Sequence, residues 1–165
     1  MYRTICRWIL TMKRNRPYSK LYRALITVFV LCMGFVAKSQ DNSLSVIANV
    51  SGAPSEMKFS ELKAIMMGEK QRWKNGKKIT IALIKTNKPI GKTTCDKIYK
   101  MSGDEVNKFW LSQVFQGRAQ APQFFSTAEE LQAYVAQNEG TIGILTTPTA
   151  SSEIKTVTID GKKSF

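Results

Sequence analysis

The segment from Thr86 to Thr94 gathers the side chains best suited to hold a ligand. It follows an apolar run, and its later part opens a stretch with helical spacing. The first backbone N–H groups of a helix lack partners, and together with nearby hydroxyl, amide and ammonium groups they attract anions. A solvated loop with ordinary helix capping gives the same pattern. The anion site predicted here consists of Thr86, Asn87, Gly91, Lys92, Thr93 and Thr94.

A second pair of candidate ligand residues, Ser51 and Gly52, follows the first expected strand, residues 44–50. Ligands of open α/β sheets collect at the carboxyl ends of the strands. We therefore expect these two residues to lie at the same edge of the sheet as the segment 86–94.

The chain lacks the side chains on which most catalytic and metal sites depend. It has no histidine, which excludes Ser–His and Cys–His nucleophile pairs and removes the commonest metal ligand. The acidic pairs at 104–105 and 129–130 fall in expected first turns of helices, where they favour the helix dipole. Gly91-Lys92 lacks the glycine five residues earlier that a P-loop needs, because Thr86 stands there. We predict a protein that is not an enzyme and uses no metal or cofactor.

The first 39 residues have the three parts of an export signal. A basic stretch precedes the apolar run from Ala24 to Ala37, and small residues follow at Ala37 and Ser39. This run is shorter than the roughly 20 residues that span a bilayer as a helix, which favours cleavage over permanent anchoring. We predict a signal peptide at 1–39, cut near Ser39, and a periplasmic or secreted domain at 40–165. Met12 is an alternative start.

The basic character of the chain belongs mostly to this leader. The first 40 residues hold eight of the 25 Lys and Arg and none of the 12 Asp and Glu, so the rest carries 17 basic and 12 acidic residues. The lysines around Trp73 resemble an exposed turn more than a binding patch. Nucleic acid is therefore not an expected partner.

The apolar periodicity predicts helices between strands, which indicates an α/β fold with a largely parallel sheet. Capping boxes are expected at Ser102 with Glu105 and at Ser126 with Glu129. The expected strands are 44–50, 79–84, 141–145 and an edge strand at 154–159, and the expected helices begin near Ser60, Lys92, Ser102 and Ser126.

Aromatic and sulfur side chains are expected mainly in the core. Helical spacing places Phe109, Trp110 and Val114 on the apolar stripe of the helix that begins at Ser102, and Cys95 on the apolar face of the preceding helix. The pair Phe124–Phe125 falls in an expected loop. Some of these rings could form a contact surface if a missing lobe leaves apolar surface uncovered.

A series of landmarks along residues 44–146 gives this chain a family resemblance. It resembles the short proteins related to the phosphate-binding component of ABC transporters, which have a truncated type II periplasmic-binding-protein fold. The landmarks are Val46–Pro54, Phe59–Gly68, Trp73–Gly76, Phe109-Trp110, Val114–Gly117, Pro122 and Val135–Ile144.

The resemblance implies a single small domain, similar to one lobe of such a binding protein, with a mostly parallel sheet flanked by helices. It implies a small anion such as phosphate as the ligand, held without catalysis. In the family the phosphate loop carries Ser, Gly and Thr near an acidic residue, whereas the matching segment here, 85–94, is basic. The alternative is a module that has kept the scaffold, lost the ligand and contacts a membrane or envelope protein.

Overall fold

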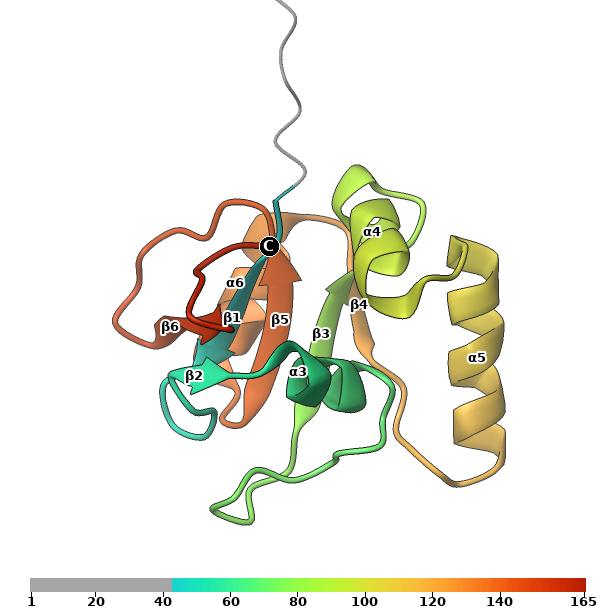
Figure 1. The fold of residues 1–165 in the computed structure, drawn as a ribbon, viewed down its shortest axis with the longest axis horizontal. Coiled ribbons are helices and arrows are strands. Elements are labelled where there is room, and N and C mark those ends of the chain that lie inside the picture. Colours follow the sequence, from blue (N-terminus) through green and yellow to red (C-terminus); the bar gives the residue numbers. More distant parts are fainter. Residues whose placement is uncertain (1–42) are drawn as a thin grey trace, which may run out of the picture. The chain divides into compact units, whose positions relative to one another are not determined.

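A six-stranded sheet organises the residues that the computed structural model describes, 43–165. The order across the sheet is β2-β6-β1-β5-β3-β4. Figure 1 shows the helices on its two sides. The strands are β1 (Ser45–Asn49), β2 (Glu56–Met57), β3 (Thr80–Ile84), β4 (Gln123–Phe125), β5 (Thr141–Leu145) and β6 (Ile154–Ile159). The helices are α3 (Phe59–Met66), α4 (Pro89–Thr94), the π-helix η1 (Cys95–Tyr99), α5 (Gly103–Phe115) and α6 (Ala128–Gln137).

The expected α/β class and mostly parallel sheet are confirmed, with one exception. β3 runs parallel to β4 and β5, and β2 runs parallel to β6. The exception is β1, which is antiparallel to both of its neighbours, β5 and β6. The carboxyl end of β1 therefore lies at the opposite edge of the sheet from that of β3.

The sheet is covered on both faces. On one face Leu131 and Val135 of α6 pack against Ile47 of β1, and on the other face a larger cluster includes Leu62 of α3 and Trp110 of α5. Because β1 and β5 are buried along their whole length, their sequences are almost continuously apolar rather than alternating.

Several predicted elements differ in detail from the observed ones. The helix expected from Lys92 begins at Pro89 and continues as η1. The capping box expected at Ser126 is formed one residue later, by Thr127 with Glu130. Phe124 and Phe125, expected in a loop, belong to β4. The expected edge strand, β6, is paired on both sides, with β1 and β2, and the short β2 and β4 form the edges of the sheet.

The core contains most of the side chains expected there. Cys95 and Trp110 are buried, and Phe109 packs against the cluster while partly exposed. Trp73 is buried as well, although the lysines around it indicated an exposed turn. Val114 is different, since 43% of it is exposed. The predicted signal peptide at 1–39 lies outside the described residues. Within 43–165, none of the helices has the length and apolar character that crossing a membrane requires.

Candidate functional site

A shallow hollow of about 390 Å³ lies beyond the carboxyl end of β3, between α4 and the start of α5. The backbone N–H of Lys85 donates to the carbonyl of Phe125, at 3.0 Å, and this bond fixes the direction in which the chain leaves the sheet. The hollow is lined by Thr86, Asn87, Lys92, Cys95, Asp96, Ser102, Gly103 and Asp104. Three of the predicted ligand residues therefore come together here.

The predicted anion site relied on free N–H groups at a helix start near Lys92, but α4 starts earlier in the chain. The helix begins at Pro89, which has no N–H, and the N–H of Lys92 already donates to the carbonyl of Lys88 at 2.9 Å. The hydroxyls of Thr93 and Thr94 donate to helical carbonyls one turn earlier, at 3.1 and 2.8 Å. These N–H and hydroxyl groups are bonded within the helix, so they are not free to donate to an anion.

Gly91 has a packing role at this site. A Cβ atom on Gly91 would lie 2.1 Å from the carbonyl oxygen of Lys85, so only glycine lets α4 lie so close to the end of β3. The backbone of Gly91 is buried and does not line the hollow. Its prediction as a ligand residue followed from its place near a helix start, but close packing explains the glycine.

The opposite wall of the hollow is formed by the first turn of α5. The amide of Asn107 donates to Oγ1 of Thr86 at 3.3 Å, and a Cβ on Gly103 would lie 2.9 Å from Cβ of Thr86. The capping box of Ser102 and Glu105 fixes the start of this helix. Loop and helix are thereby held together, so Thr86 has a defined position at the rim.

The charges around the hollow are mixed. Lys92 contributes an exposed ammonium, while Asp96 and Asp104 contribute carboxylates. Burial, and to a smaller extent the charge of Asp96, raises the pKa of the Cys95 thiol. Cys95 therefore stays neutral near pH 7 and is not an activated nucleophile. An anion at this site would meet one positive group and two acceptors.

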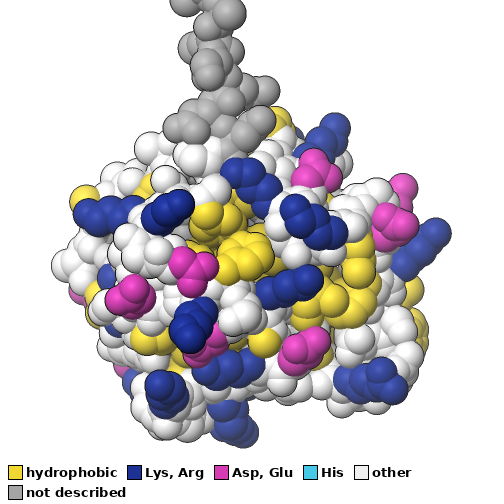
Figure 2. Space-filling view, viewed as in Figure 1, with side chains coloured by type: hydrophobic (Ala, Val, Ile, Leu, Met, Phe, Trp, Pro, Cys, Tyr) yellow, Lys and Arg dark blue, Asp and Glu magenta, His cyan; other side chains and the backbone are white. Residues whose placement is uncertain are grey.

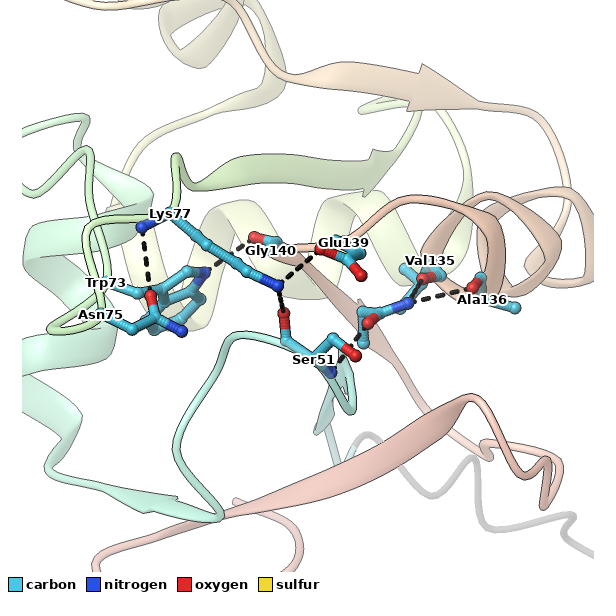
Figure 3. Close-up of polar contacts among 9 residues, drawn as sticks. Ser51, Trp73, Asn75, Lys77, Val135, Ala136, Glu139 and Gly140 are labelled. Atoms are coloured by element: carbon cyan, nitrogen blue, oxygen red, sulfur yellow. Dashed lines mark hydrogen bonds and ion pairs between the residues drawn. The ribbon is translucent and has the colours of Figure 1, made fainter.

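Ser51 and Gly52 do not join this site, and the expectation that they would is wrong. Because β1 is antiparallel to β5, the loop that follows it lies next to Gly140, at the start of β5. Figure 3 shows the contacts of this loop. Nζ of Lys77 donates to the carbonyl of Ser51 at 3.2 Å and also pairs with Glu139. Gly52 lines a separate hollow of about 220 Å³, together with Trp73 and Lys74.

Asn49 anchors that loop, and the sequence analysis did not single it out. Its amide donates to the carbonyls of Val135 and Ala136, both at 3.0 Å, and its Oδ1 accepts the N–H of Ser51 at 2.9 Å (Figure 3). The buried side chain thus provides hydrogen-bond partners both for carbonyls at the end of α6 and for an N–H of the turn after β1. An asparagine that ends an apolar strand is the signal that could have indicated this role.

The residues lining the hollow beyond β3 that sequence reasoning missed are Cys95, Asp96 and the Ser102–Asp104 turn. The capping box at Ser102 was predicted, but sequence alone did not bring that helix start next to Thr86. Within residues 43–165, no group of three or more His, Cys, Asp or Glu side chains could hold a metal ion.

Comparison with solved structures defines the class of this fold. An ABC-type phosphate transport receptor from Vibrio cholerae superposes with a TM-score of 0.58 at 10% identity, over 79% of this chain and 55% of that one. PstS from Borrelia burgdorferi gives 0.55 at 14% identity, over 73% and 48%. A phosphate ABC transporter substrate-binding protein from Clostridium perfringens, solved with bound phosphate, gives 0.50 at 14% identity, over 74% and 48%.

The described residues therefore have the fold of periplasmic binding proteins. More particularly, they resemble part of the fold of phosphate ABC transporter receptors, since the chain covers between 48% and 55% of the length of these three. No family model matches the sequence, and no curated protein matches it. The likeness at this level of identity shows the fold alone.

Proposed function

We propose that this chain is an exported, non-catalytic solute-binding domain that takes a small oxyanion such as phosphate in the hollow beyond β3. One observation carries the proposal: Thr86, Asn87 and Lys92 converge there with the first turn of α5. The fold shared with phosphate receptors, one of them solved with bound phosphate, supports it.

The two carboxylates give the proposed site a chemical preference. Asp96 and Asp104 line the same hollow as Lys92. An ionised carboxylate can accept a hydrogen bond but cannot donate one. Phosphate ions remain protonated near neutral pH, whereas sulfate ions do not. The site is therefore expected to favour phosphate over sulfate, with Lys92 contacting an ionised oxygen and a carboxylate contacting the P–OH group.

Isothermal titration calorimetry on the exported chain tests this proposal. All 165 residues are expressed in a bacterial host, and the processed protein is titrated with phosphate, sulfate and chloride at constant ionic strength. We expect saturable heat with phosphate and less with sulfate. Lys92→Ala should abolish the signal, whereas Lys63→Ala, which removes an exposed lysine of α3 outside the hollow, should keep it.

Two outcomes would contradict the proposal. The first is the absence of saturable heat in a protein that melts cooperatively. The second is a phosphate signal that survives Lys92→Ala and disappears in Lys74→Ala, which would assign the ligand to the separate hollow beside Gly52.

The second candidate function is a module that contacts a membrane or envelope protein and binds no solute. It is favoured by the hydroxyls of Thr93 and Thr94, which donate to helical carbonyls. A protein that folds but ignores every anion would support this alternative.

A further inference from the structure

The segment between α3 and β3 forms a hairpin, residues 70–79, which we call the basic hairpin. It contains no acidic residue and five basic ones: Lys70, Arg72, Lys74, Lys77 and Lys78. Figure 1 shows this segment as the green loop that reaches away from the sheet before β3 begins. Lys70 is half-buried, and the other four basic side chains are exposed. Positive charge is therefore concentrated on one protruding part of the domain.

Hydrogen bonds hold the basic hairpin in a defined shape. The backbone N–H of Trp73 donates to the carbonyl of Lys77, and that of Ile79 donates to the carbonyl of Gln71, both at 2.8 Å. The Trp73 side chain is 3% exposed, and its indole N–H donates to the carbonyl of Gly140 at 2.9 Å. The backbone of the hairpin is thus ordered before any partner binds, which lowers the entropy cost of binding.

Three of the basic side chains have no ion pair within residues 43–165. The two ion pairs of that region join Lys70 to Glu61 and Lys77 to Glu139. Neither of them uses Arg72, Lys74 or Lys78. Arg72 and Lys78 form an antiparallel bridge, so two like charges are directly opposite each other, an arrangement that lowers stability. A local cost of this kind is expected at functional sites.

Two carboxylates near the base of the hairpin also lack an ion pair within residues 43–165. Glu69 lines a hollow that it shares with Arg118. Glu56 lines the hollow of about 220 Å³ that also contains Lys74. Glu56 is therefore the carboxylate that opposes the charge of the hairpin, and three unpaired cations exceed it.

The side chains of the basic hairpin indicate which kind of partner fits it. Protein interfaces depend on apolar and aromatic anchors, and single-stranded nucleic acids stack on exposed aromatic rings. The hairpin offers neither, because its one aromatic side chain, Trp73, is buried. Lysine contacts phosphate as a point charge rather than in a fixed bidentate geometry. A layer of anionic phospholipid headgroups presents many phosphates to such a protruding surface and requires no shaped groove.

We propose that the basic hairpin binds the surface of an anionic phospholipid bilayer. Arg72, Lys74 and Lys78 contact the headgroup phosphates. The hairpin stays at the level of the headgroups, because it exposes no apolar side chain. Binding is reversible and weakens with salt, which screens exposed charges. None of the hairpin residues lines the hollow beyond β3, so the proposal does not depend on phosphate binding there.

Co-sedimentation with lipid vesicles tests this proposal on the protein expressed from all 165 residues. The vesicles contain either phosphatidylcholine alone or equal parts of phosphatidylcholine and phosphatidylglycerol. We expect binding to the anionic vesicles at low salt. Lys74→Gln and Lys78→Gln should each weaken it about fivefold, and the triple variant with Arg72→Gln about a hundredfold, because each basic residue near an anionic surface contributes roughly the same factor. Glu56→Gln should strengthen binding, because it removes the opposing charge.

Lys108→Gln is the matched control, because it removes the same charge from an exposed lysine of α5 and should keep wild-type binding. All variants share residues 1–42, so any contribution of that segment to binding is common to them. Thermal melting without vesicles verifies that each variant is folded.

Three outcomes would overturn the proposal. The first is a wild-type protein that does not bind the anionic vesicles at low salt, including one that is retained instead on an acidic polypeptide. The second is equal binding to both kinds of vesicle. The third is a triple variant that binds as tightly as the Lys108→Gln control, since net charge or another segment would then be responsible.

Discussion

At the scale of single residues, several polar side chains within residues 43–165 are hydrogen-bonded to backbone groups. Asn49 holds the end of α6, and the hydroxyl of Thr94 holds the carbonyl of Ile90. Trp73 donates through its indole N–H to the carbonyl of Gly140 at 2.9 Å. Such buried bonds contribute modestly to stability when made and cost more when one partner is removed. They leave few buried polar side chains available for a ligand.

Thr141, the first residue of β5, departs from this pattern. Its side chain is fully buried, and its Oγ1 is the buried side-chain atom in residues 43–165 without a hydrogen-bond partner. Thr141→Val replaces this hydroxyl with a methyl group of similar shape, so we expect the free energy of unfolding to rise by about 1 kcal/mol.

Urea unfolding measures the effect, with Thr94→Val as the matched control. The Thr94 hydroxyl is also buried but donates at 2.8 Å, so its removal should lower the free energy of unfolding by about 1 kcal/mol. If both substitutions change the free energy of unfolding by the same amount in the same direction, the hydrogen-bond partner of the hydroxyl does not determine the effect of removing it.

At the scale of elements, α5 depends on its capping box to form the wall of the hollow. The backbone N–H and the hydroxyl of Ser102 both donate to the carboxylate of Glu105, and these bonds lower the pKa of Glu105. A lowered folded-state pKa means that the stabilisation is present above the unfolded pKa of about 4.3 and is lost as pH falls through the folded value.

We therefore expect Glu105→Gln to flatten the loss of stability in the acid range. Glutamine can still take part in a capping box but carries no titrating charge. Urea unfolding at a series of pH values below neutrality gives the slope. A Glu105→Gln slope equal to that of the wild type would contradict this account of the cap.

At the scale of the whole molecule, the sequence predicted the class of fold but not the direction of every strand. The apolar runs at 79–84 and 141–145 indicated buried strands, which are β3 and β5. The antiparallel direction of β1 follows from long-range pairing that no local pattern encodes. This one difference separates Ser51 and Gly52 from the rest of the predicted site.

The sequence likewise predicted one part of the candidate site and not the other. Thr86, Asn87 and Lys92 were found because a polar loop after a buried strand is visible in the sequence. Asp96 and the start of α5 were missed, since only tertiary packing brings them to that loop.

The positive and negative side chains of the described domain are interspersed on the face shown in Figure 2, which agrees with a net charge much smaller than that of the whole chain.

The most direct test of the account is to locate the bound anion in solution. The protein expressed from all 165 residues is labelled with nitrogen-15, and its backbone amide resonances are followed while phosphate is added. The account predicts saturable shifts confined to the hollow, at Asn87, Lys92 and Gly103, with the amide of Gly52 unmoved. Shifts centred on Gly52 and Trp73, or no saturable shifts in a folded protein, would contradict phosphate binding beyond β3.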